Sequence, residues 1–363
     1  MSVFNGKNLN VEIFGESHSE KIGAVVKGFP KFSPDFDQLN GFLSRRKAGG
    51  GVFSTARIEA DEPVFEGVSD GTIDGEFSFY ILNRNVKSRD YDNLYGKPRP
   101  NHADICAYLK DGTLSFTGGG RFSGRLTAPF CVVGGICKQY LEARGIRIAA
   151  FIAKTGNVNG LSYKDRKLTI DEIENKRTGE YPSLNKKAEM KEEIKNAKAD
   201  CDSVGGRIEC VISGLPAGMG DNLFGGLEGM LSSAIYAVPA VKGVEFGLGF
   251  GFCDKRASEV NDEMFYQDGK IKFYSENAGG IYGGIACGED VTIGVAVKPT
   301  PSISKPQRTV DLANKTNAEI KIVGRHDACI LPRAVPVIES AAAIALTDEI
   351  IAFEKENKKQ KPN

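Results

Sequence analysis

Many strand-like segments of this 363-residue chain follow one another without a helix between them. Residue patterns predict strands at 9–14, 23–28, 75–82, 147–153, 207–213, 244–249 and 291–297. They predict helices after Ser33-Pro34, at about 103–110, in the apolar run ending near 144, and at about 223–237 and 335–354, with a charge-rich, solvated helical excursion at 183–199. Parallel strands need a long crossover, usually a helix. This order therefore favours an α+β fold with antiparallel sheets over a doubly wound parallel sheet.

Composition narrows the class of protein. The formal net charge is zero and the pI is about 6.8, which argues against nucleic acid or an anionic membrane as a partner. No apolar run approaches the roughly 20 residues of a membrane span, and the amino terminus has no secretory signal pattern. The eight cysteines are scattered without C-x-x-C pairs, which indicates reduced thiols in a cytoplasmic protein and no metal site.

The chain has only three histidines, and each lies beside a hydroxyl or a carboxylate. They are His18 in Ser17-His18-Ser19, His102 two residues before Asp104, and His326 in Gly324-Arg325-His326-Asp327. Imidazole titrates near neutral pH, and a neighbouring carboxylate can orient it or tune its pKa. Each histidine taken alone is equally well explained as a structural residue. The shared setting of all three favours acid–base chemistry.

Arginines cluster beside glycines in several segments of the chain: Arg45, Arg46, Arg57, Arg99, Arg121, Arg125, Arg325 and Arg333. Glycine lets the backbone approach an anion closely, and arginine binds phosphate or carboxylate with paired donors. Any single pair can equally be a solvated turn, but several together indicate a ligand with more than one anionic group. No P-loop is present, and the segment from Gly118 to Ser123 misses the Rossmann pattern at its last position. Ser17 and Ser123 lie outside G-x-S-x-G, so a hydrolase is poorly supported.

Motifs spread over nearly the whole chain resemble those of the chorismate synthase family. They are Gly15-Glu16-Ser17-His18, Arg45-Arg46, Arg99-Pro100-x-His102-Ala103-Asp104, Gly118-Gly119-Gly120-Arg121-x-Ser123-x-Arg125-x-Thr127, Ala240-Val241-Lys242-Gly243, Asn277-Ala278-Gly279-Gly280-Ile281-x-Gly283-Gly284, Lys298-Pro299-Thr300 and Gly324-Arg325-His326-Asp327-x-Cys329. Each is weak alone, but their combination in this order is specific.

The resemblance implies a lyase that converts 5-enolpyruvylshikimate 3-phosphate to chorismate and phosphate by anti-1,4-elimination. This is the last step of the shikimate pathway for aromatic amino acid biosynthesis, and it needs reduced FMN without net redox change. The resemblance also implies a homotetramer of single-domain β-α-β sandwiches with antiparallel sheets and helices. We expect that domain to cover residues 1–355 and the tail at 356–363 to fray.

The resemblance also implies roles for residues at matching positions. His18 would govern protonation of the reduced flavin, His102 would act near the departing phosphate, and Asp327 would take part in proton removal. Substrate or NADP anions would be gripped by Arg46, Arg99 and Arg125. FMN would be contacted by Arg121, Phe122, Ser123, Pro239, Ala240, Gly283, Lys298, Pro299, Thr300, Pro301, Ser302 and Arg325.

The chain departs from the family pattern at several positions, which are Ser19, Ala48, Val52, Asn101, Phe122, Gly124, Leu126, Pro239 and Ala328. Val52 stands where many members carry an arginine linked with NADPH use. We therefore predict reliance on an external flavin reductase or reducing agent. Two rival hypotheses remain: an anion-binding or nucleic-acid-interacting homologue without activity, and a phosphate-ester hydrolase, for which no metal cluster or activated nucleophile is evident.

Overall fold

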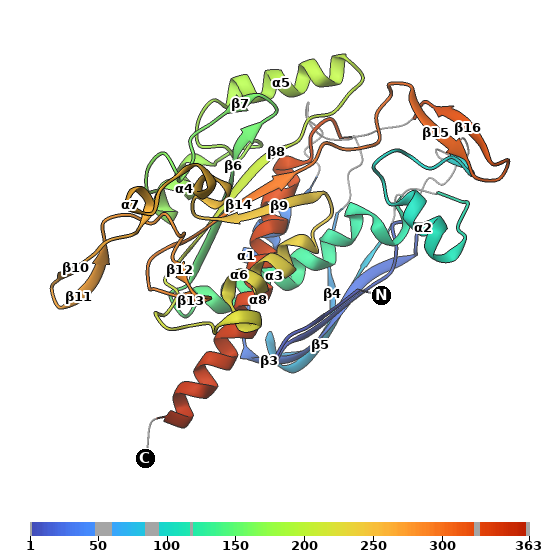
Figure 1. Cartoon of the computed structure of the whole chain (residues 1–363). Helices are drawn as coiled ribbons and strands as arrows, with labels where there is room; N and C mark the ends of the chain where they lie inside the picture. Colours follow the sequence, from blue (N-terminus) through green and yellow to red (C-terminus); the bar gives the residue numbers. More distant parts are fainter. Residues whose placement is uncertain (1, 48–59, 84–93, 117–118, 323–326, 361–363) are drawn as a thin grey trace.

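The computed structural model describes residues 2–47, 60–83, 94–116, 119–322 and 327–360. Four positions singled out in the sequence therefore lie outside the described residues: Ala48, Val52, Arg325 and His326. The first of two large sheets has the antiparallel order β1-β2-β3-β5-β4 (Figure 1). Its strands are β1 (Ser2–Asn5), β2 (Asn10–Phe14), β3 (Lys21–Phe32), β4 (Val64–Ser69) and β5 (Thr72–Leu82).

The second large sheet has the antiparallel order β7-β6-β8-β14-β9. Its strands are β6 (Arg147–Thr155), β7 (Val158–Asn159), β8 (Gly206–Ser213), β9 (Val241–Phe246) and β14 (Val291–Val297). Three separate hairpins are formed by β10 (Met264–Gln267) and β11 (Lys270–Phe273), β12 (Ile281–Tyr282) and β13 (Ile285–Ala286), and β15 (Gln307–Asp311) and β16 (Thr316–Ile320).

Helices fill the space between the two sheets (Figure 1). Helix α3 (Thr127–Glu142) packs on β3 of the first sheet, and α8 (Leu331–Gln360) packs on β6 and β8 of the second. Helices α1 (Phe36–Ser44) and α6 (Leu227–Tyr236) pack against α3 and α8 respectively. The remaining helices are α2 (Asp104–Asp111), α4 (Ile170–Lys176), α5 (Lys187–Ala199) and α7 (Ala257–Val260). The expected α+β sandwich with antiparallel sheets is confirmed.

The two central helices touch through small residues. A Cβ added at Gly134 of α3 would lie 2.2 Å from the Ser340 Cβ of α8. No larger residue fits at Gly134 without separating the helices. The Thr347 hydroxyl of α8 donates to the Cys137 carbonyl of α3, further along both helices than the contact between Gly134 and Ser340. Because the two contacts advance in the same sense, α3 and α8 run in the same direction and their amino ends lie at the same end of the sandwich.

Strand β6 is apolar on both faces. Ile148, Ala150 and Ile152 join the main core, whereas Ala149 and Phe151 face a second buried cluster with Ile170 and Ile173 of α4. A strand covered on both sides loses polar alternation and reads as a continuous apolar run. The expectation that 183–199 is merely a solvated excursion was wrong: α5 buries Met190 and Ile194 in the main core.

Element boundaries differ from the sequence patterns at several places, including β9 and α8. Strand β9 ends at Phe246 rather than 249, because Gly247 turns the chain with a φ of +53°. Helix α8 begins at Leu331, four residues before the expected start, because Pro332 lies in the first turn, where no intrahelical N–H partner is needed. It continues to Gln360, beyond the boundary expected at 355. Within the described part of the chain, no helix combines the length and the apolar run needed to cross a bilayer.

Candidate active site

Several of the predicted site segments converge at the amino ends of α3 and α8. The Arg46 Nε donates 2.9 Å to the hydroxyl of Thr127, the first residue of α3. The Arg333 Nε, in the first turn of α8, donates 3.2 Å to the backbone carbonyl of Arg46. Helix amino ends carry partial positive charge. Both central helices therefore favour an anion at this end of the sandwich.

A buried charge cluster lies beside these helix ends. Asp61 accepts a hydrogen bond from Arg46 Nη1 at 2.6 Å through one oxygen and from Arg125 Nη1 through the other. The three residues are only 6%, 3% and 8% exposed. Burial lowers the pKa of Arg46 to about 10, as do the neighbouring charges of Arg333 and Arg125, while Asp61 opposes this. Arg46 therefore stays charged at neutral pH. The sequence patterns did not single out Asp61 as a site residue.

The turn that carries His18 is anchored to the same cluster. Arg125 Nε donates 3.0 Å to Asn83, whose side-chain nitrogen donates 2.7 Å to the Ser19 carbonyl. The Ser17 N–H donates 3.2 Å to the carbonyl of Gly120, which adopts a φ of +50°. The Ser19 hydroxyl also bridges the turn to the Lys21 carbonyl at 2.8 Å. The Ser19 departure is thus accommodated as a turn-closing residue.

A second ion pair holds His102. Arg99 donates to both carboxylate oxygens of Asp104, at 2.7 and 2.8 Å, and His102 Nδ1 lies 2.6 Å from Asp104 Oδ1. Burial alone would raise the pKa of the Asp104 carboxyl, but the hydrogen bonds from Arg99 and His102 outweigh it and lower the pKa to about 2. An ionised carboxylate only accepts, so His102 Nδ1 carries the proton and Nε2 is left for a ligand. Asn101 takes a φ of +56°, a conformation that asparagine tolerates.

The Asp104 carboxylate is expected to contribute acid-sensitive stability. Its pKa of about 2 lies below the ordinary 3.8. The contribution is therefore complete above about pH 4 and is lost as the pH falls toward about 2, by about 2 kcal/mol. Asp104→Asn should flatten the fall in unfolding free energy over this range, measured by urea titration at each pH. Asp171→Asn, at a 73% exposed carboxylate outside the site, serves as the control. An unaltered slope in Asp104→Asn would contradict the prediction.

Asp327 is placed by the start of α8. Its carboxylate accepts from Arg333 Nη1 at 2.9 Å, and its side chain is 12% exposed. The next residue, Ala328, is buried, and its carbonyl accepts from the Val204 N–H at 2.9 Å. This hydrogen bond to the segment just before β8 holds the backbone at the Ala328 departure.

The segments expected to contact flavin are only partly brought together. The Lys298 N–H donates 2.9 Å to the Ala240 carbonyl, and Lys298 Nζ donates to the Asn101 carbonyl beside His102. Burial lowers the pKa of the Lys298 ammonium, with help from Lys242. Arg121 pairs with Asp111 at 2.6 Å near the surface and lies over the Phe122 ring.

Gly283 lies apart from the other predicted flavin contacts. It belongs to the β12–β13 hairpin, which joins the amino end of β14, whereas Lys298 follows the carboxyl end of that strand. Seven strand residues separate these ends, a span of about 20 Å. Within one chain, the structure therefore does not bring Gly283 to Lys298.

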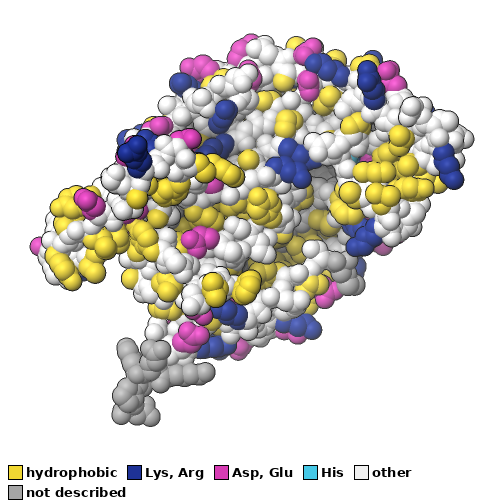
Figure 2. All heavy atoms as spheres, in the orientation of Figure 1, with side chains coloured by type: hydrophobic (Ala, Val, Ile, Leu, Met, Phe, Trp, Pro, Cys, Tyr) yellow, Lys and Arg dark blue, Asp and Glu magenta, His cyan; other side chains and the backbone are white. Residues whose placement is uncertain are grey.

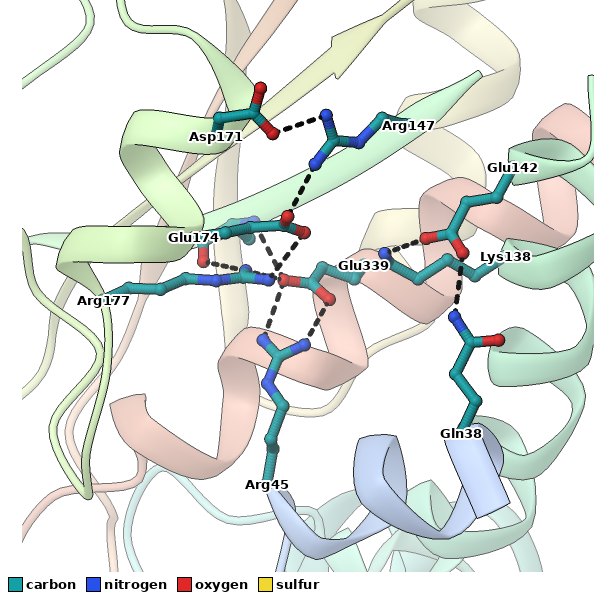
Figure 3. Close-up of polar contacts among 10 residues, drawn as sticks. Gln38, Arg45, Lys138, Glu142, Arg147, Asp171, Glu174, Arg177 and Glu339 are labelled. Carbon is teal, nitrogen blue, oxygen red and sulfur yellow. Dashed lines mark hydrogen bonds and ion pairs between the residues drawn. The ribbon is translucent and has the colours of Figure 1, made fainter. Parts of the chain in front are cut away.

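A second buried charge cluster is centred on Glu339, a residue that the sequence patterns did not single out. Figure 3 shows the guanidinium groups of Arg45 and Arg177 converging on this carboxylate. Arg45 donates to its two oxygens at 2.8 and 2.9 Å, and the Ala150 N–H donates at 2.9 Å. Burial alone would raise the pKa of Glu339, but the charges of Arg177 and Arg45 hold it well below its usual range. The cluster ties the end of α1, beside Arg46, to α8 and β6.

Comparison with known proteins identifies the family of the chain. A family model described as chorismate synthase matches residues 9–351. Proteins named chorismate synthase from Methanococcus aeolicus and Pyrococcus abyssi are 42% and 41% identical, covering 95% of this chain and 96% and 97% of their own lengths. A crystal structure of chorismate synthase superposes with a TM-score of 0.73 at 25% identity, covering 96% of this chain and 93% of that chain. The chain is thus an enzyme that belongs to the chorismate synthase family, a family of lyases.

Proposed function

We propose that this enzyme converts 5-enolpyruvylshikimate 3-phosphate to chorismate and phosphate with reduced FMN as cofactor, in the shikimate pathway of aromatic amino acid biosynthesis. The observation that carries the proposal is that cationic side chains lie beside both predicted catalytic residues: Arg99 and Lys298 at the segment of His102, and Arg333 at Asp327. Arg46 and Arg125 share Asp61, and Lys298 reaches the segment of His102. A substrate with two carboxylates and a phosphate matches this surplus of positive charge.

The described residues fit a phosphate-bearing cofactor at the Lys298 segment. The Thr300 hydroxyl oxygen is buried without a hydrogen-bond partner in the described part of the chain. Buried polar atoms normally have partners, so an unpaired hydroxyl beside a desolvated lysine suits an anionic ligand. Lys298, Thr300, Ala240 and Arg121 would hold FMN. When bound, reduced FMN supplies electron density to the substrate as phosphate departs.

The chain's own residues would provide binding and proton transfer. Arg46, Arg99 and Arg125 would fix the substrate anions and stabilise the charge on the departing phosphate. His102, oriented through Nδ1 by Asp104, would present Nε2 to that phosphate. Asp327, held by Arg333, would take part in removing the ring proton. His18 would hold a proton beside the cofactor.

One anaerobic assay tests the proposal. Purified enzyme receives reduced FMN and enolpyruvylshikimate phosphate, and chorismate and phosphate are followed together. Equal release of both products supports the lyase. Phosphate without chorismate would indicate the hydrolase, and neither product would indicate the inactive anion-binding homologue.

Supply of the reduced cofactor is a separate part of the proposal. We infer a cytoplasmic enzyme that depends on an external flavin reductase, since Val52 replaces the expected arginine. The free state of all eight cysteine thiols supports a reducing compartment. NADPH oxidation by the purified protein with FMN alone would contradict the dependence.

We also propose that the chain assembles into a homotetramer. Figure 2 shows hydrophobic side chains gathered over the β10–β11 hairpin. Tyr266 of this hairpin is 78% exposed, and Phe250 and Tyr274 outside it are 81% and 70% exposed. A monomer seldom leaves so much hydrophobic surface exposed in one region. Gly283 would also reach a flavin at Lys298 only from a second copy.

Charge placed on this surface is expected to disrupt the assembly. The doubly substituted variant Phe250→Asp/Tyr266→Asp should sediment as a smaller species than the parent, because a buried unpaired carboxylate is costly at an interface. Leu109→Asp, at a 75% exposed position on α2, is the matched control and should keep the parental mass. Equal sedimentation of the parent and the double variant would contradict this interface.

A further inference from the structure

Asp61 lies between Arg46 and Arg125, two arginines of the proposed site. Each carboxylate oxygen takes one guanidinium: Oδ2 accepts from Arg46 and Oδ1 from Arg125. The geometry therefore sets both the spacing and the relative orientation of the two cations. Without this carboxylate, two buried like charges would repel each other directly.

The other donors of both guanidinium groups are also restrained. Arg46 donates to the Thr127 hydroxyl at 2.9 Å and to the Gly124 carbonyl at 3.4 Å. Arg125 donates to Asn83 at 3.0 Å. Each guanidinium group is therefore held in one place while it is buried. A cation that is already fixed binds an anion without a further cost in side-chain ordering.

The backbone at Asp61 is itself unusual. Its φ is +48°, in the left-handed region that non-glycine residues seldom adopt. Such a conformation persists where the surroundings over-determine it. The two ion pairs supply that determination, and the resulting geometry places the carboxylate of the connection before β4 between the end of α1 and the turn before α3.

We propose that Asp61 is a positioning residue that holds Arg46 and Arg125 at the spacing required to bind an anionic group of the substrate. The inference rests on the proposed lyase function. It assigns Asp61 no contact with substrate or cofactor, because both of its oxygens are occupied by arginine. Its effect is expected in substrate binding rather than in the chemical step.

The test compares Asp61→Asn and Asp61→Glu with the parent in the anaerobic assay. Asp61→Asn keeps the shape but removes the charge, and kcat/KM should fall about 10²-fold, mainly through KM. Asp61→Glu restores the charge on a side chain one methylene longer, and should recover part of this loss. The control, Asp171→Asn, removes an exposed carboxylate that pairs with Arg147 at 2.7 Å and should behave as the parent.

The outcomes separate this inference from the proposed function. A parent enzyme that forms no chorismate refutes the lyase proposal itself. An active parent together with a folded Asp61→Asn variant whose kcat/KM stays within about threefold of it, a difference well under 1.4 kcal/mol, overturns the positioning role. So does a loss confined to kcat. If thermal unfolding shows that Asp61→Asn does not fold, Asp61→Glu decides: a raised KM with near-parental kcat supports the role, and an unchanged KM overturns it.

Discussion

Replacing Glu339 with alanine is expected to lower the free energy of unfolding by about 3–5 kcal/mol. The carboxylate is 0% exposed and accepts from Arg45, Arg177 and the Ala150 N–H. Removing it leaves two guanidinium groups and one amide without their partner inside the protein. The loss would be measured by urea unfolding at neutral pH, where the parent carboxylate is ionised.

A matched control lies in the same view of the molecule (Figure 3). Glu142 pairs with Lys138 at 2.6 Å, but its side chain is 27% exposed, so Glu142→Gln should cost less than about 1 kcal/mol. Glu339→Gln keeps the volume and isolates the charge. If Glu339→Ala and Glu142→Gln differ by less than about 1 kcal/mol, the burial argument is wrong.

Replacing His102 with alanine is expected to lower kcat by about 10²–10⁴-fold with a smaller change in KM. The Asp104 carboxylate at 2.6 Å orients the ring, and the Lys298 ammonium lies at the neighbouring Asn101 carbonyl. Loss of a correctly placed imidazole at the departing phosphate affects the transition state more than the bound substrate. A large fall in kcat with a smaller change in KM is also expected for Asp327→Ala, because Arg333 holds that carboxylate in one orientation.

The measurement is steady-state kinetics in the anaerobic assay, with the parent and Asp171→Asn as references. Asp104→Asn provides a graded comparison: the imidazole remains but loses its charged partner, so kcat should fall less than in His102→Ala. Parental kcat in His102→Ala would remove this residue from the mechanism. A rise in KM with unchanged kcat would reassign it to substrate binding.

Local patterns predicted much of the fold. Asp35 at the start of α1 accepts from the N–H groups of Asp37 and Gln38, a capping arrangement that depends on neighbours in sequence. His102 and Asp104, which pair with each other, likewise lie only two positions apart in the sequence. Boundaries were less predictable, as at Pro332 in α8, because the helix there is stabilised by packing between the sheets rather than by propensity.

The residue types and motifs by themselves determined the α+β class and the family resemblance, and they predicted a polyanionic ligand. Only the tertiary structure decided which distant residues meet. Asp61 pairs with Arg125, Glu339 pairs with Arg45, and Gly134 packs against Ser340. It also separated Gly283 from Lys298 within the chain. The physical reason is that periodicity and capping act over a few residues. A buried ion pair or a close helix contact depends instead on how distant segments pack. The type of one residue does not identify the distant residue that it will contact.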